Sequence, residues 1–144
     1  MPVKAIPEGF HSVTPHLTLQ GAVQEIAFMQ KALGAKELAR HEGPNGTIMH
    51  ALVQVGDSKI MLGDAGTESG AKPCLLCMYV EDTDAYYHRA MAAGAKTVRA
   101  PETMFYGDRT AGVVTSTGMQ WWFMTHVEDV STEELERRMK AQKK

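Results

Sequence analysis

Three groups of residues have side chains that could bind or transform a small molecule. Two tryptophans are adjacent at Trp121 and Trp122, two histidines lie in apolar stretches at His16 and His50, and the two cysteines form a C-x-x-C spacing. Indole rings stack on flat organic molecules, imidazoles act as bases or metal ligands, and paired thiols serve redox or zinc chemistry. Which chemistry is available depends on the elements that carry these residues.

The segment Gly118–His126 contains both tryptophans and is predicted to be a strand. Because side chains alternate along a strand, Trp121 and Phe123 point to one face and Trp122 points to the other. Both faces are therefore apolar. Such a strand is either buried on both sides, which is the more common case, or covered on one side while its other side lines a ligand cleft.

The two cysteines lie in a second predicted strand. Cys74 and Cys77 belong to an apolar segment, residues 74–80, that is typical of a buried strand, and their spacing directs the two thiols to opposite faces. We therefore expect both cysteines to be packing residues, with no redox or zinc function. The ten methionines suit a core or a cleft that adapts its shape.

Length, charge and hydropathy exclude several classes of function. The chain has 144 residues, enough for one domain with a core, and its formal net charge of -2 provides no field that would attract nucleic acid or an anionic membrane. No apolar run approaches the roughly 20 residues that a membrane span needs, and the first nine residues contain no apolar signal core. We therefore expect a cytoplasmic protein without nucleic-acid or membrane partners.

The predicted elements form the same series twice. We expect one structural domain made of an N-terminal arm at 1–12, a first βαβββ module at 13–66, a second at 74–126 and a charged C-terminal helix at 127–144. The first module has a strand at 13–19, a helix at 22–33 and strands at 36–41, 48–55 and 59–62. The second has a strand at 74–80, a helix at 82–93 and strands at 96–99, 111–115 and 119–126, with a long loop at 100–110.

Local signals support the duplication. The first helix ends in KALGAK at Lys31–Lys36 and the second in MAAGAK at Met91–Lys96. A two-residue turn at Gly56–Asp57 places Leu52 opposite Met61 by counting outward. One module alone could not bury its helix-facing sheet, so the two are expected to pack together and curve around a cleft.

Two further signals concern the ends of the modules. The first strand is expected to direct Val13, Leu17 and Leu19 toward the core, with Pro15 at an edge or bulged position because proline cannot donate to a ladder. Ser131 and Glu134 have capping-box spacing, which predicts the start of a solvated C-terminal helix.

Five motifs occur in a characteristic order: Ile6–Pro15, Ile26–Phe28 with Lys31–Ala35, Gly56–Leu62, Phe105–Arg109 and Thr125–Val130. Together they resemble the PhnB-like branch of the vicinal oxygen chelate superfamily, which contains glyoxalase I, extradiol dioxygenases, fosfomycin-modifying enzymes and bleomycin-binding resistance proteins. The resemblance extends from Val3 to about Glu134. It implies an α+β fold in which tandem βαβββ modules form a curved mixed sheet around a cleft, the glyoxalase/bleomycin resistance fold.

The resemblance also bears on metal and cofactors. Metal-dependent members of the superfamily bind an ion through four His, Glu or Gln side chains, and the corresponding positions here are Thr14, Met61, Leu75 and Trp122. These side chains cannot hold a divalent ion, so no metal is expected. No glycine-rich cofactor loop supports the methyltransferase label that some members of the branch carry, and no cofactor is expected.

With the predicted strands aligned as in the superfamily, an apolar, aromatic cleft is expected, which would bind a small aromatic or apolar organic ligand. The predicted ligand-binding residues are His16, His50, Leu52, Met61, Leu75, Cys77, Tyr79, Gln120, Trp122, Met124 and Arg109. His16, Tyr79 and Gln120 would orient the ligand. Arg109 would reach an anionic group of the ligand, or else form a structural salt bridge or turn with Asp108.

Three functions stay open at this stage. The first is a metal-independent binding protein of the bleomycin-resistance kind, a homodimer by resemblance, with no catalytic residue. The second is a lyase, isomerase or dioxygenase-type enzyme with a metal site relocated to His16, His50 and Cys77, or with a histidine as general base. The third is a protein whose cleft is filled by its own side chains and which acts only through its surface.

Overall fold

The computed structural model describes residues 3–66 and 70–142. Parts of three predicted segments lie outside the described residues: Met1 and Pro2 of the arm, Thr67–Ser69 of the loop between the modules, and Lys143 and Lys144 of the C-terminal helix. By its contacts the chain divides into two compact units, each containing one module. The first contains the described residues up to Cys74 together with Thr115–Met119, and the second contains Leu75–Val114 and the described residues from Gln120 onward.

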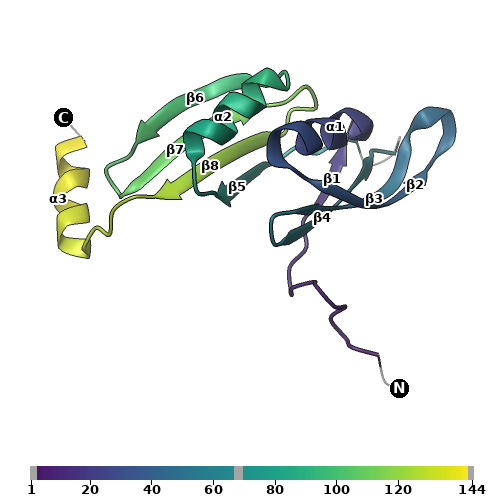
Figure 1. The fold of residues 1–144 in the computed structure, drawn as a ribbon, viewed down its shortest axis with the longest axis horizontal. Helices are drawn as coiled ribbons and strands as arrows, with labels where there is room; N and C mark the ends of the chain where they lie inside the picture. The colour runs from purple at the N-terminus through teal and green to yellow at the C-terminus, as the bar shows by residue number, and fades with distance from the viewer. Residues whose placement is uncertain (1–2, 67–69, 143–144) are drawn as a thin grey trace. The chain divides into compact units, whose positions relative to one another are not determined.

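The first unit is a four-stranded mixed sheet with one long helix, shown in purple to blue-green in Figure 1. Its elements are β1 (His16–Leu19), α1 (Ala22–Leu33), β2 (Lys36–Glu42), the short 3-10 helix η1 (Pro44–Gly46), β3 (Ile48–Val55) and β4 (Ser58–Asp64). The strand order is β1-β4-β3-β2, in which β1 is parallel to β4 and the other pairs are antiparallel. The predicted hairpin register is confirmed, since Leu52 pairs with Met61.

The core of the first unit lies between α1 and the sheet. Alternation along the strands directs one set of apolar side chains under the helix, where Leu17, Val53 and Leu62 are at most 1% exposed. The helix contributes Ile26 and Met29, both fully buried, and ends at a left-handed glycine, as its sequence predicts. Burial of this face holds the sheet and the helix together.

The start of β1 differs from the expectation. Pro15 cannot donate a backbone N–H, so the strand begins at His16, while the Pro15 carbonyl still accepts from the N–H of Met61 at 2.9 Å. Val13 therefore lies outside the strand and is 81% exposed, which corrects its predicted place in the core. The predicted edge position is confirmed, because β1 is the outermost strand of its sheet.

The second unit repeats the arrangement, as the green and yellow ribbon of Figure 1 shows. Its elements are β5 (Leu75–Tyr79), α2 (Thr83–Ala92), β6 (Lys96–Thr103), β7 (Asp108–Val114), β8 (Gln120–His126) and α3 (Thr132–Gln142). The strand order is β5-β8-β7-β6, with β5 parallel to β8. The predicted α+β class and the tandem βαβββ series are thus confirmed, and each module forms its own four-stranded mixed sheet.

In the second unit α2 packs on β6, β7 and β8. Trp121 and Phe123 of β8 are fully buried, and the Tyr86 ring of α2 lies 5.6 Å from that of Phe123. The Asp82 carboxylate caps the helix by accepting from the N–H of Ala85 at 3.1 Å. The two tryptophans therefore point to opposite faces of the strand, as alternation predicts.

Equivalent residues of β4 and β8 hold the start of the helix in each module. Asp64 accepts from the N–H groups of Gly21 and Ala22 at 2.9 and 3.0 Å, and Thr125 accepts from the N–H of Thr83 at 3.1 Å. Partial burial acts to raise the pKa of the Asp64 carboxyl, but its backbone N–H donors outweigh that effect and lower the pKa. In both modules a side chain near the end of the last strand thus accepts from the backbone N–H groups at the start of the helix, which supports the internal duplication.

The predicted loop at 100–110 is mostly strand. β6 runs on to Thr103, and β7 begins at Asp108, before the predicted start at Ala111. Pro101 fits within β6 because this is an edge strand with a register shift between Arg99 and Glu102. This correction matters for the site, because it places Asp108 in the sheet, on the strand next to that of Arg99.

The C-terminal helix is solvated but not free of contacts. The N–H of Glu134 donates to the Ser131 hydroxyl at 3.2 Å, which confirms the predicted N-cap. Arg138 donates to the carbonyl of Phe105 at 2.9 Å and forms an ion pair with Glu128. These contacts tie α3 to the loop between β6 and β7.

Candidate functional site

The strongest candidate site is the face of the second sheet opposite α2, here called the helix-free face. Register places six of the predicted ligand-binding residues on it: Leu75, Cys77, Tyr79, Gln120, Trp122 and Met124. Leu75 and Tyr79 are 50% and 66% exposed, although both carry large apolar surfaces. Exposed apolar surface next to polar groups is typical of binding sites.

Trp122 lies at the centre of this face. It pairs with Cys77 on β5 and with Gly112 on β7. A Cβ atom at position 112 would lie 2.5 Å from the indole, so the ring rests directly on the glycine backbone. The indole N–H donates to Oε1 of Gln120 at 3.0 Å. Trp122 is therefore held flat and half-buried, which is the geometry of a stacking surface.

A polar cluster lies at one end of the helix-free face. The buried carboxylate of Asp108 accepts from the Tyr79 hydroxyl at 2.7 Å and from Nδ1 of His126 at 2.8 Å. Nε2 of His126 donates to Asp129 at 2.7 Å. The hydrogen bonds that His126 donates to Asp108 and, second, to Asp129 raise the pKa of the imidazole. The hydrogen bond that Tyr79 donates to Asp108 raises the pKa of the phenol. The imidazole thus joins β7 to the segment after β8.

The raised pKa of His126 predicts a pH-dependent stability. Because folding raises the pKa of His126 above the ordinary value of about 6.5, protonation of the imidazole stabilises the folded protein. This stabilisation is fully present below about pH 6.5 and is lost as the pH rises through the raised pKa. The unfolding free energy of wild type, relative to His126→Gln, should therefore fall over the range in which the pH rises above about 6.5. Denaturant titration of both proteins measures this difference. A constant difference across that range would show that the imidazolium does not bridge the two carboxylates.

The remaining predicted residues of the first unit share one face of their own sheet. His16 pairs with Met61, which pairs with Leu52, and all three point away from α1. The rings of His16 and His50 are 6.0 Å apart, and that of His41 lies 6.5 Å from His50. The first sheet thus carries a row of histidines beside apolar side chains.

Arg109 is placed differently. It pairs with Thr125 and forms a bidentate ion pair with Asp84 of α2, at 2.6 and 2.9 Å, so it does not share the face of Trp122. Asp108, its predicted alternative partner, binds Tyr79 and His126 instead. The geometry supports a structural role for Arg109, which joins α2 to β7.

The two cysteines are exposed, which corrects the expectation that they pack in a buried strand. β5 is an edge strand of its sheet, so no neighbouring strand in that sheet covers its outer edge. The N–H of Cys74 and its thiol contact the Met119 sulfur, at 3.3 and 3.9 Å. Although Cys74 is exposed as a residue, partial desolvation of its thiol raises the pKa and keeps it protonated at neutral pH.

The four positions that correspond to metal ligands do not fit a metal. Thr14 and Met61 offer one hydroxyl and one thioether, and Leu75 and Trp122 offer no donor atom for a cation. Within residues 3–66 and 70–142, no group of three or more His, Cys, Asp or Glu side chains is arranged to hold an ion. The donor chemistry at these positions therefore does not support the superfamily's metal site.

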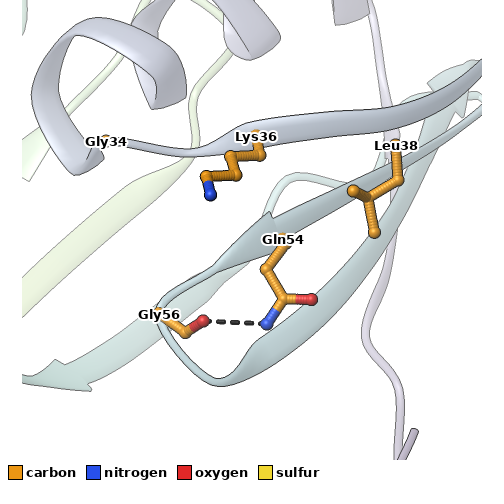
Figure 2. A pocket seen from close by; sticks show the side chains of 5 residues that line it. All are labelled: Gly34, Lys36, Leu38, Gln54 and Gly56. Atoms are coloured by element: carbon orange, nitrogen blue, oxygen red, sulfur yellow. Dashed lines mark hydrogen bonds between the residues drawn. The ribbon is translucent and has the colours of Figure 1, made fainter. Parts of the chain in front are cut away.

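The first unit also contains a pocket of about 490 Å³, away from the histidine row. Figure 2 shows Lys36 and Leu38 of β2 and Gln54 of β3, with Gly34 and Gly56 completing the wall. The Gln54 amide donates to the Gly56 carbonyl at 2.8 Å and accepts from Lys59 at 2.6 Å. Because the amide is already engaged at both ends, Gln54 offers a ligand in this pocket few further polar contacts, and Lys36 is the charged side chain of the wall.

Sequence reasoning missed three residues of the candidate site. Arg99 and Asp108 were assigned to a short strand and a loop, and Gly112 was not distinguished from its neighbours. Counting outward from a two-residue turn at Thr117–Gly118 would have paired Gly112 with Phe123, whereas the loop in the structure has three residues, 116–118, and pairs Gly112 with Trp122. A glycine opposite a tryptophan indicates close approach of the ring to the backbone.

Comparison with known proteins agrees with the fold and the motifs. The family model of the Glyoxalase/Bleomycin resistance protein/Dioxygenase superfamily matches residues 23–123. Mb0911c, an uncharacterized protein from Mycobacterium bovis, is 32% identical over 142 residues, covering 91% of this chain and 93% of its own length. Rv0887c from Mycobacterium tuberculosis has the same identity and covers 84% of its own length. None of the described helices is long and apolar enough to cross a membrane.

Solved structures share the same fold. TioX from Micromonospora sp. ML1 has a TM-score of 0.69 at 24% identity, covering 81% of this chain and 99% of its own. A PhnB protein from Bacillus cereus, titled a putative 3-demethylubiquinone-9 3-methyltransferase, has a TM-score of 0.64 at 14% identity, covering 80% and 99%. With the family match over residues 23–123, the chain belongs to the Glyoxalase/Bleomycin resistance protein/Dioxygenase superfamily.

Proposed function

We propose that the protein binds a small, flat organic molecule without a metal, on the helix-free face of the second sheet. The observation that carries this proposal is the placement of Trp122, whose indole lies flat over Gly112 and is fixed by the Gln120 amide. A ring held in this way loses little freedom when a ligand stacks on it.

The surroundings of Trp122 support an apolar or aromatic ligand. Leu75 and Met124 supply apolar surface on the neighbouring strands, and Tyr79 combines an exposed ring with a hydroxyl fixed by Asp108. Such a surface buries the body of a ligand, while a few polar groups orient it.

We further propose that the protein acts as a homodimer, as bleomycin-binding members of the superfamily do. β5 is an edge strand that exposes Leu75 and Tyr79. An exposed apolar edge strand is a surface that a second chain can cover. A second copy would then complete the enclosure of the ligand.

The adjacency of His16 and His50 favours a second candidate function. Two imidazoles with ring centroids 6.0 Å apart could act together on a bound molecule, or contribute two ligands to a relocated metal site. Cys77, the third member of the predicted relocated set, belongs to the other unit. The second candidate is therefore a metal-dependent or histidine-based enzyme.

Tryptophan fluorescence tests the proposed binding function. An aromatic ligand on the helix-free face should quench part of the emission, and Trp122→Phe should remove most of that response because Trp121 is fully buried under α2. Titration with a library of small aromatic compounds measures the quenching. Equal quenching of wild type and Trp122→Phe would place the ligand elsewhere.

Metal analysis of the purified protein separates the two candidates. A binding protein of the proposed kind contains no stoichiometric transition metal. Stoichiometric Zn²⁺, Ni²⁺ or Fe²⁺ that is lost in His16→Ala, but kept in the matched variant His88→Ala on the exposed side of α2, would instead establish the enzyme with a relocated site.

A further inference from the structure

The helix-free face contains a cation next to the stacking surface. Arg99 of β6 pairs with Gly112 of β7, which pairs with Trp122 of β8, so the three residues lie side by side across neighbouring strands. The Arg99 guanidinium carbon lies over the indole ring, 5.0 Å from its centroid, so the cation covers part of the surface on which a ligand would stack. Because Gly112 has no side chain, nothing separates the guanidinium from the ring.

Arg99 is half-buried and has no acidic partner. Its guanidinium donates to the Thr110 hydroxyl at 3.4 Å and to the Met104 sulfur at 3.8 Å, which are long bonds to neutral groups. Within the part of the chain that the structure describes, no carboxylate forms an ion pair with it. Four other arginines do have such partners: Arg40, Arg109, Arg137 and Arg138.

The acidic groups nearest in the sheet do not compensate this charge. Asp108 lies on the same face, but the hydroxyl of Tyr79 and the imidazole of His126 use its two oxygens. Glu102 pairs with Thr110 on the same strand pair and is exposed to solvent, without an ion pair to Arg99. A guanidinium stays charged at neutral pH, and a partly desolvated cation is stabilised by an anion.

We infer that the ligand is a planar aromatic acid, whose ring stacks on Trp122 and whose carboxylate binds Arg99. This inference rests on the proposed binding function. A guanidinium presents parallel N–H donors that match the two oxygens of a carboxylate. On the other side of the indole, Oε1 of Gln120 accepts from Trp122, so the amide NH₂ is left as a further donor. The face thus combines one cation with an aromatic surface.

The test compares two probes that differ only in charge, 2-naphthoate and the neutral 2-naphthamide, by isothermal titration calorimetry. Wild type should bind the naphthoate at least about tenfold more tightly than the amide, as expected for charge-assisted hydrogen bonds. Arg99→Gln should reduce this ratio to less than about twofold. Arg99→Lys keeps the charge without the planar fork and should give an intermediate ratio.

The outcomes separate the inference from the proposed function. If both probes bind equally to wild type, or if the preference for naphthoate persists in Arg99→Gln, the role of Arg99 is wrong and the binding function stands. If neither probe binds wild type, the inference and the aromatic binding function fail together. Arg89→Gln is the matched control, because Arg89 stacks on Tyr86 of α2 and should leave the ratio unchanged. Should Arg99→Gln fail to fold, an intermediate ratio in Arg99→Lys would support the inference and an unchanged wild-type ratio would overturn it.

Discussion

Replacement of Trp121 by alanine should lower the free energy of unfolding by about 3–5 kcal/mol, the usual range for removal of a buried tryptophan. Trp121 is fully buried and pairs with Val113 on the α2-facing side of the sheet. Truncation leaves a cavity that the neighbouring strands cannot close without moving. Guanidinium denaturation, followed by far-UV circular dichroism, measures the loss.

The adjacent residue provides the control. Trp122→Ala removes the same number of atoms from the opposite, partly exposed face, so it should cost about 1–2 kcal/mol through the smaller area that it buries. If Trp122→Ala proved as destabilising as Trp121→Ala, the assignment of the two faces would be reversed. If Trp121→Ala is not obtained in folded form, Trp121→Phe should still be less stable than Trp122→Phe.

Glu25→Ala should destabilise the first unit by about 2–4 kcal/mol. The Glu25 carboxylate is 1% exposed and accepts from the hydroxyls of Thr115 and Thr117, both at 2.6 Å. Hydrogen bonds to a charged group contribute about 1.5–3 kcal/mol each, and their loss leaves the two hydroxyls with only their mutual contact at 3.2 Å. Chemical denaturation of the variant measures the effect.

Glu25→Gln is the informative comparison for this contact. The amide oxygen can still accept from both threonines, so the glutamine variant should retain part of the stability that alanine loses. Glu133→Ala, in the exposed first turn of α3, should change stability by less than about 0.5 kcal/mol. A loss below about 1 kcal/mol in Glu25→Ala would contradict the view that the carboxylate holds the turn between β7 and β8.

The alternation of the strands and the turn residues predicted most of the fold. The pairing of Leu52 with Met61 followed from a two-residue turn, and the opposite faces of Trp121 and Trp122 followed from a period of two. The helix ends at Gly34 and Gly94 followed from the repeated letters before them. In each case a local rule was sufficient.

Errors arose where neighbouring strands override a local rule. Pro101 suggested a loop, but an edge strand with a register shift accommodates a proline, and so β6 extends past Arg99. Cys77 suggested burial by its apolar neighbours, but β5 is an edge strand and the thiol is exposed. Arg109, for which the sequence left open a ligand contact or a structural salt bridge with Asp108, pairs with Asp84, while the Arg99 guanidinium lies over the Trp122 ring.

The proposed stacking surface could not have been identified from the sequence alone. Its essential features are the indole of Trp122, the bare backbone of Gly112 against it and the guanidinium of Arg99 over the ring. These residues are well separated in sequence, and only the register of three strands brings them together. Sequence spacing gave the strand that carries the tryptophan but not its neighbours.

Fluorine NMR of protein labelled with 5-fluorotryptophan tests the central claim most directly, because the chain contains only two tryptophans. Trp122→Phe assigns the two resonances. On titration with an aromatic ligand, the Trp122 resonance should shift in a saturable manner while that of Trp121, buried under α2, should move little. A saturable shift of the Trp121 resonance alone, or a bound ligand that leaves the Trp122 resonance unchanged, would contradict binding on the helix-free face.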